Sequence, residues 1–271
     1  MKNIVFLCAL LLAISSCKKN NFDIINLNGN KISALGHGGM GIANAYPLNS
    51  FESILKSLNI GADGTEIDVQ MTKDSVLVAF HSGSLDNKTT ASGRIFNKTW
   101  DQIKEARYTD PIYSNYRIIN LDELFSNVKN SNEYSFFFDC KNFNPDTSEF
   151  YVNTFSNAIL KIIDKYQLEE NTYIELKRLD IIKALKNKRP DLKIFIYTSF
   201  AAAFEIANQC NLQGIVVPVD NVTKEEVVKA HNSGIMVAVF NAHSKNRNID
   251  AIEKQVDFIQ SDKLKHLLKL L

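Results

Sequence analysis

The sequence shows no excess of either charge and no apolar run long enough to cross a membrane. Its 271 residues carry 31 Lys and Arg against 30 Asp and Glu, a formal net charge of +1, which gives no electrostatic footprint for nucleic acid. A membrane-spanning helix needs about 20 apolar residues, and the run Ile4–Ile14 is shorter. There is no internal repeat and no low-complexity segment. With 45% hydrophobic residues, the chain can build the core of one globular domain.

The N-terminus predicts a secretory signal peptide, because a lysine-bearing start precedes the apolar run and small residues follow it. The sequence Ile14-Ser15-Ser16-Cys17 resembles a bacterial lipobox. We therefore expect a signal peptide over 1–16, then a lipidated Cys17 and its tether over 17–30. The protein would be an exported cell-envelope lipoprotein, periplasmic or on the cell surface, with this anchor as its only membrane contact. The alternative is an ordinary signal peptide followed by a chance cysteine.

Cysteine is too scarce to support a disulfide-rich scaffold. If Cys17 carries lipid, the mature chain keeps only Cys140 and Cys210. Both stand in apolar or helical surroundings, which favours two buried thiols, although an oxidising compartment permits a disulfide.

From residue 31 onward, short apolar runs alternate with segments of helical periodicity. This alternation predicts an α/β fold, a (β/α)8 TIM barrel over 31–271, because parallel strands need crossover connections. A doubly wound open sheet is the structural alternative, with fewer strands. Residues 82–133 are longer than one crossover needs, so we expect a long insertion between the third and fourth strands. The predicted strands are Ile32–Gly36, Thr65–Val69, Val76–Phe80, Tyr134–Phe138, Thr172–Leu176, Lys193–Tyr197, Gly214–Pro218 and Ile235–Phe240.

Ionisable residues stand where the first four predicted strands end, which is the rim that carries the active site in such barrels. Glu66 and Asp68 are two residues apart on a strand, so both side chains point to one face. Two carboxylates aimed into a barrel mouth repel each other unless a cation lies between them. Oxygen ligands without cysteine favour Ca²⁺ or Mg²⁺, with Asp139 as the third ligand. The full set is His37, Glu66, Asp68, His81, Asp139 and Lys141.

Two histidines complete this rim. His37 lies among glycines in Gly36–Gly39, and His81 directly follows an apolar run. A pair of imidazoles across a metal ion suits general acid–base catalysis near neutral pH.

Three segments, Gly36–Gly39, Gly61–Asp74 and Val78–His81, resemble the glycerophosphodiester phosphodiesterases. The resemblance implies a metal-dependent hydrolase that releases an alcohol and glycerol 3-phosphate. It implies that His37 and His81 are the acid–base pair and that Glu66 and Asp68 bind the metal. Asp139 and Lys141 match the family's Glu-x-Lys, with Asp in place of Glu.

The chain departs from the family at two further positions. Gly38 stands where the family has a phosphate-binding Arg, and Leu48 where it has Glu. Lys141 or Arg94 could hold the phosphate instead. Three further residues are candidates for the site: Glu175 as a substrate contact or the alternative third ligand, Phe240 along the glycerol site, and His243 at the rim.

These observations predict a hydrolase of glycerophosphodiesters. Two alternatives stay open: a phosphodiesterase of lysophospholipids or sugar phosphodiesters, and a non-catalytic binding lipoprotein on the same barrel.

Overall fold

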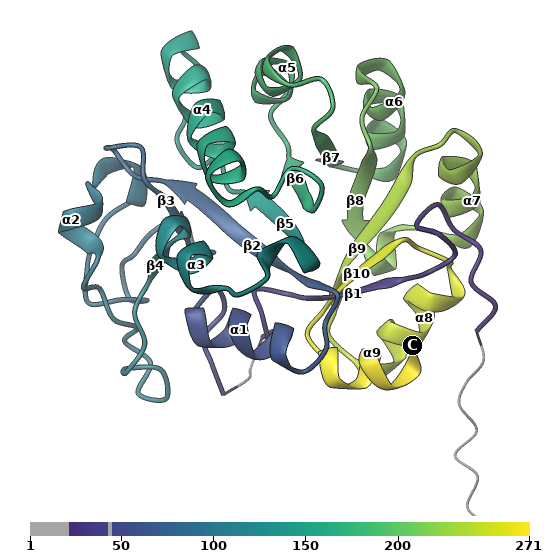
Figure 1. The fold of residues 1–271 in the computed structure, drawn as a ribbon, viewed down its shortest axis with the longest axis horizontal. Coiled ribbons are helices and arrows are strands. Elements are labelled where there is room, and N and C mark those ends of the chain that lie inside the picture. The colour runs from purple at the N-terminus through teal and green to yellow at the C-terminus, as the bar shows by residue number, and fades with distance from the viewer. Residues whose placement is uncertain (1–21, 43–44) are drawn as a thin grey trace, which may run out of the picture.

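The computed structural model describes residues 22–42 and 45–271, and within these residues eight parallel strands close into a barrel (Figure 1). The first and second barrel strands pair with each other, and the remaining strands follow in chain order back to the first. The predicted (β/α)8 barrel is therefore confirmed. Its strands are β1 Ser33–Gly36, β2 Gly64–Met71, β5 Ser135–Cys140, β6 Thr172–Leu176, β7 Lys193–Tyr197, β8 Gly214–Pro218, β9 Met236–Ala242 and β10 Phe258–Ser261.

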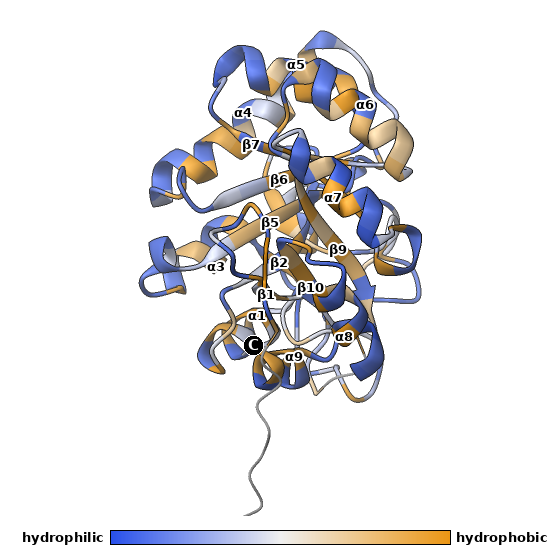
Figure 2. Cartoon of the chain, turned by 90° about the vertical axis from the view of Figure 1, so that its right-hand side faces the viewer, coloured by the Kyte–Doolittle hydropathy of each residue, from blue (hydrophilic) through white to orange (hydrophobic). Residues whose placement is uncertain are grey.

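Helices surround the strands, and hydroxyl side chains begin several of them. Ser50, Ser148 and Thr223 each accept a hydrogen bond from a first-turn backbone N–H, which satisfies a donor that the helix cannot. In Figure 2, hydrophobic colour dominates β9, whereas hydrophilic and hydrophobic stretches alternate along the helices. The helices that follow the barrel strands are α1 Phe51–Asn59, α3 Leu121–Asn127, α4 Glu149–Tyr166, α5 Leu179–Lys188, α6 Phe200–Cys210, α7 Lys224–Asn232, α8 Lys245–Glu253 and α9 Leu264–Leu270.

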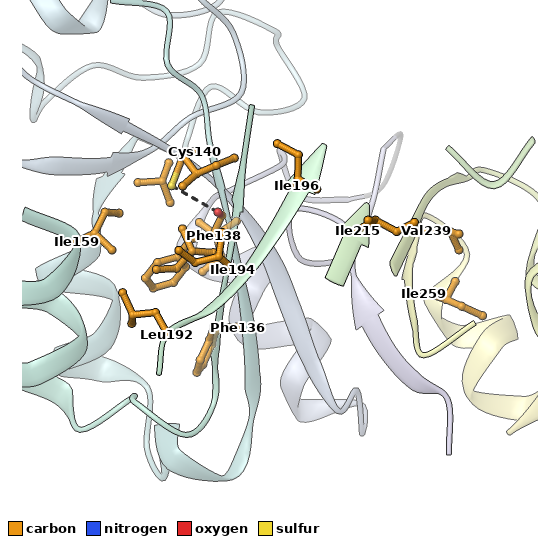
Figure 3. Close-up of a cluster of buried hydrophobic side chains, with 14 of the residues drawn as sticks. Phe136, Phe138, Cys140, Ile159, Leu192, Ile194, Ile196, Ile215, Val239 and Ile259 are labelled. Carbon is orange, nitrogen blue, oxygen red and sulfur yellow. Dashed lines mark hydrogen bonds between the residues drawn. The ribbon is translucent and has the colours of Figure 1, made fainter. Parts of the chain in front are cut away.

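The two faces of each barrel strand enter different cores. On β5, Phe136 and Phe138 pack outward against the helices, with Ile159 of α4 among their neighbours (Figure 3). Phe137 points the other way and joins the cluster inside the barrel. Because strand side chains alternate, Asp139 lies on the same inner face as Phe137. The core packing thus already determines which side chains enter the barrel mouth.

The predicted strand Val76–Phe80 is not a barrel strand. Its central part, β3 Leu77–Ala79, runs antiparallel to β2, and β4 Ile119–Asn120 pairs with it in turn. A tight turn, with the N–H of Thr72 donating to the carbonyl of Val76, folds the chain back on β2. An apolar run gives no strand direction, which is why the sequence could not distinguish this hairpin from a barrel strand.

The insertion therefore lies between the second and third barrel strands, not between the third and fourth as predicted. It contains β3, β4, the short helix α2 Trp100–Ile103, and the 3₁₀ turns η1 Ile95–Asn97 and η2 Ser131–Glu133. It also has a small core of its own, made of Val78, Phe80, Leu85, Ile95, Ile103, Ala106 and Ile118.

The eighth barrel strand, β10, was missed. Polar residues interrupt the apolar sequence of this segment. Three of them are buried in or next to β10: Asp257, Gln260 and Ser261. A short run that buries polar side chains inside a barrel lacks the apolar signature by which strands are recognised. A 3₁₀ turn, η3 Val219–Asn221, follows β8.

The segment before β1 packs against the end of the barrel where the strands begin. The N–H of Ile25 donates to Oε1 of Gln255 over 2.6 Å, and that of Leu27 donates to Oδ1 of Asp257 over 2.8 Å. The later part of the expected tether is thus docked on the barrel. The predicted signal peptide and Cys17 lie outside the described residues.

Neither a membrane span nor a disulfide occurs in the part of the chain that the structure describes. No helix there has the length and apolarity that crossing a bilayer demands. Cys140 and Cys210 are both free thiols; Cys140 is buried and Cys210 is partly buried.

Candidate active site

Three carboxylates meet at the C-terminal mouth of the barrel. Glu66 and Asp68 come from β2, and Asp139 comes from the neighbouring β5, where it is directly paired with Asp68. Ile67 and Val69, the alternate residues of β2, pack in the outer core. One ligand atom from each carboxylate lies within 4.8 Å of the other two. This is the geometry of a site that can hold one metal ion.

The cluster has more negative charge than its surroundings neutralise. Burial, followed by the charges of Asp68 and Asp139, raises the pKa of Glu66 well above its usual range. Oε2 of Glu66 accepts a hydrogen bond of 2.8 Å from the N–H of Gly38, but its Oε1 is buried without a hydrogen-bond partner. An orphaned buried carboxylate oxygen between two further carboxylates fits a hard divalent cation.

Lys141 is the cation of this cluster. Its Nζ lies 2.9 Å from Oδ1 of Asp68 and also contacts Asp139. Burial alone would lower the pKa of Lys141, but the surrounding carboxylates outweigh burial and raise it. Burial alone would raise the pKa of Asp68, but the charges of Lys141 and His81 lower it. Lys141 therefore stays charged beside the carboxylates, where a phosphate oxygen could also reach it.

Asn49, which sequence reasoning did not assign to the site, positions Asp68. Its Nδ2 donates to Oδ2 of Asp68 over 2.6 Å, and its Oδ1 accepts from the Asp68 N–H over 2.9 Å. Asn49 is fully buried and adopts a left-handed conformation with φ of 63°. The one feature of the sequence that could have drawn attention to Asn49 is its position directly before Ser50, the N-cap of α1.

His37 lies between the carboxylate cluster and a second missed residue, Asp262. Its Nδ1 is 2.9 Å from Oδ1 of Asp262, and its Nε2 is 4.0 Å from Oε2 of Glu66. Burial alone would lower the pKa of His37, but the hydrogen bond and charge of Asp262 outweigh it and raise the pKa. Asp262 stays ionised: burial opposes this, but its contacts with His37, Ile42 and His243 lower its pKa to about 2.

His81 stands on the insertion side of the site, just after β3. It is exposed, and it lines a cavity between the insertion and the loop that follows β1. Burial raises the pKa of Asp68, and the charges of Lys141 and then His81 lower it. Both predicted catalytic histidines thus lie close enough to Asp68 for their charges to lower its pKa.

Glu175 lies beside Asp139 in the barrel, but outside the three-carboxylate cluster. It is buried on β6, where its Oε2 accepts a hydrogen bond of 3.3 Å from Nε2 of Gln260. Burial, and then the charge of Asp139, raises its pKa well above the usual range. The geometry therefore places Asp139, rather than Glu175, with Glu66 and Asp68.

Of the three other predicted substrate contacts, Phe240 and His243 lie near the barrel mouth and Arg94 lies away from it. Phe240 packs edge-on against Tyr197 with ring centres 5.1 Å apart, and His243 contacts Asp262 through Nδ1. Arg94 is exposed in the insertion, with its guanidinium 5.8 Å from the centre of the Phe96 ring. Within the described residues no hydrogen bond or ion pair joins Arg94 to the carboxylates.

Relatives in sequence agree on one family. Residues 40–266 match the model of the glycerophosphoryl diester phosphodiesterase family. A glycerophosphodiester phosphodiesterase of Bacillus altitudinis is 21% identical over 82% of this chain and 91% of its own length. An uncharacterised protein of Bacillus subtilis is 32% identical, but the match spans 32% of this chain and only 37% of that protein.

Solved structures agree on the fold. A phosphodiesterase of Oleispira antarctica, solved in complex with the product sn-glycerol-3-phosphate, matches with a TM-score of 0.76 and 15% identity, over 90% of this chain and 98% of that one. A structure from Galdieria sulphuraria, described as a glycerophosphodiester phosphodiesterase, matches with a TM-score of 0.76 and 21% identity, over 88% and 96%. The family model spans most of the chain, so this protein belongs to the glycerophosphoryl diester phosphodiesterase family.

Proposed function

We propose that the protein hydrolyses glycerophosphodiesters to an alcohol and glycerol 3-phosphate, using one divalent metal ion, Ca²⁺ or Mg²⁺. The observation that carries this proposal is the cluster of Glu66, Asp68 and Asp139 at the barrel mouth, with His37 at its edge. Membership of the family supports the substrate class. A metal bound there would polarise a phosphoryl oxygen of the diester.

His37 and His81 would act as the acid–base pair. Asp262 would accept a hydrogen bond from the Nδ1–H of His37. Nε2, on the side of Glu66, would then be free to exchange a proton with the substrate. His81 would be the second member of the pair, so one imidazole can take a proton from the attacking hydroxyl or water while the other delivers one to the departing oxygen.

Phosphate would be held without the arginine that the family has at Gly38. Lys141 is already at the cluster and stays charged. Glu175, Phe240 and His243 remain our candidates for contacts with the rest of the substrate, whereas Arg94, which has no contact with the cluster, would have to swing inward to help.

The protein would be exported and anchored through a lipid on Cys17. The docked segment supports an orientation for this arrangement, because Ile25 and Leu27 attach to the end of the barrel opposite the carboxylates. Only a short stretch joins them to Cys17, so the catalytic mouth would face away from the anchoring membrane. Metabolic labelling with a fatty acid tests the anchor: wild type should be labelled and Cys17→Ala should not.

A panel of purified diesters tests the function. Wild type should release glycerol 3-phosphate from glycerophosphocholine or glycerophosphoethanolamine, and His37→Ala and His81→Ala should not, with unchanged circular dichroism. Full activity in either folded variant would contradict the acid–base assignment. Metal binding without turnover of any deacylated lipid, lysolipid or sugar diester would favour the non-catalytic alternative.

A further inference from the structure

A cavity of about 580 Å³ opens beside His81, between the loop after β1 and the insertion. This volume falls within the roughly 300–1,000 Å³ typical of small-molecule sites. It is much larger than choline, ethanolamine or glycerol requires. More than half of its lining residues are apolar or aromatic: Ile42, Tyr46, Pro47, Leu48, Phe80, Tyr108, Pro111 and Tyr113.

The cavity is continuous with the catalytic residues. His81 forms part of its wall, and so does Ile42, whose N–H donates to Oδ1 of Asp262 over 2.8 Å. That same Asp262 oxygen contacts His37. A diester bound between the two histidines would therefore direct one of its two arms into this cavity.

Two of the positions at which the chain departs from its family, Gly38 and Leu48, meet at this wall. Gly38 has a φ of 52°, and a Cβ added there would lie 2.9 Å from Cδ2 of Leu48. Leu48 itself lines the cavity. Where the family has an arginine and a glutamate, this chain thus has a glycine packed against a leucine. Both changes remove charge from the same corner, so they are one alteration of the wall rather than two unrelated ones.

The opposite wall presents aromatic surface. The hydroxyl of Tyr108 donates to the carbonyl of Leu48 over 3.1 Å, which engages its polar end in holding the insertion against the loop. The Phe80 and Tyr108 rings lie side by side, with centres 6.3 Å apart. Ile42, in the cavity wall, is 46% exposed.

We propose that this cavity selects phosphodiesters with one large apolar arm, such as an acyl chain on the glycerol, over diesters with two small polar arms. This proposal rests on the proposed function and specifies its substrate class. The apolar arm would bury against Leu48 and the aromatic wall, while the phosphate stays between the histidines. Each buried methylene favours binding, so the preference should grow with chain length.

Two substrates that differ only in the acyl chain test this directly. Glycerophosphocholine and 1-hexanoyl-lysophosphatidylcholine, used below its micellar concentration, share the glycerol, phosphate and choline groups. We expect wild type to show a kcat/KM at least tenfold higher for the acylated diester. Leu48→Asn and Tyr113→Ser should each lower the ratio of the two kcat/KM values at least fivefold. The matched control is Leu179→Asn, at a position of α5 that is 41% exposed and outside the cavity lining, which should keep the wild-type ratio.

The outcomes separate this proposal from the function on which it rests. Turnover of both diesters without preference, or with preference for glycerophosphocholine, overturns the apolar-arm proposal and leaves the proposed function standing. A wild-type ratio in both folded cavity variants also overturns it. No turnover of either diester with Ca²⁺ or Mg²⁺ contradicts the proposed function, and this proposal with it.

Discussion

The Nδ1 atom of His37 lies 2.9 Å from Oδ1 of Asp262, although 225 residues separate them in the chain. His37 directly follows the first barrel strand, and Asp262 directly follows the last. Closure of the barrel makes these strands neighbours, so the fold itself assembles the pair. Asp262 fixes which nitrogen of His37 carries the proton and how the ring is oriented.

Replacing Asp262 should impair catalysis more than binding. Asp262→Asn keeps the shape of the side chain but offers His37 an amide, which favours the wrong tautomer. We expect kcat to fall by about 10²–10⁴-fold, the usual contribution of general acid–base catalysis, with a much smaller change in KM. Steady-state kinetics measure both. The control is Asp250→Asn, which removes only the Lys254 ion pair on α8. A proportional rise in KM with unchanged kcat would contradict a positioning role.

Metal binding should stabilise the fold and depend on Glu66. A ligand at about 100 times its Kd stabilises the native state by about 2.7 kcal/mol. In a domain of this size, that amounts to a Tm rise of roughly 5–10 °C. Thermal unfolding with and without excess Ca²⁺ or Mg²⁺ measures the rise. Glu66→Gln should abolish most of it, whereas Glu253→Gln, at an exposed position, should not. An equal rise in the Glu66 variant would place the metal elsewhere.

The metal-free protein should lose stability as the pH rises. A carboxyl whose folded-state pKa is raised contributes stability that is present below its unfolded pKa and lost as pH rises through the folded value. Glu66 and Glu175 both have raised pKa values, chiefly from burial. With chelator present, the free energy of unfolding should therefore be lower at about pH 8 than at about pH 5.

Variants identify the groups responsible for this pH dependence. Urea titrations of Glu66→Gln and Glu175→Gln should show a smaller difference between the two pH values than wild type does. Glu253→Gln serves again as the exposed control. A pH dependence identical in all four proteins would show that the buried carboxylates do not cause it.

The inside of the barrel should be sensitive to truncation. The Phe137 ring packs against Tyr173, Phe258 and Phe195, with ring centres 4.7, 4.9 and 5.2 Å away. Phe137→Ala should lower the free energy of unfolding by about 3–5 kcal/mol, from lost burial and the cavity left behind. Phe150→Ala, at a position 81% exposed, should change it by about 0.5 kcal/mol or less. Similar losses in denaturant unfolding would contradict the packing described for β5.

The sequence predicted those parts of the site that obey strand periodicity. Glu66 and Asp68 occupy alternate positions on one strand, so their common inward face follows from the chain alone. Asp139 follows from the same alternation, because Phe136 and Phe138 are the outward residues of β5. The barrel itself followed from the alternation of strands and helices.

What the sequence could not supply depends on contacts between distant segments. Asp262 and Asn49 act on His37 and Asp68 through hydrogen bonds that only the closed barrel creates. The strand direction of Val76–Phe80 and the polar strand β10 were misjudged because hydrophobicity records neither direction nor buried polar side chains. The contact between Gly38 and Leu48 likewise emerges only in three dimensions.

The most direct measurement is the release of glycerol 3-phosphate by protein stripped of metal and then titrated with Ca²⁺ or Mg²⁺, for wild type, His37→Ala and Glu66→Gln. The two substrates are glycerophosphocholine and 1-hexanoyl-lysophosphatidylcholine. The acylated product of the second substrate is deacylated enzymatically before glycerol 3-phosphate is measured. We predict no activity before metal is added, recovery on titration of wild type, and little or none in either variant. Full activity of wild type in chelator, or recovery of both variants to the wild-type rate, would contradict the assignment of this rim as a metal-dependent phosphodiesterase site.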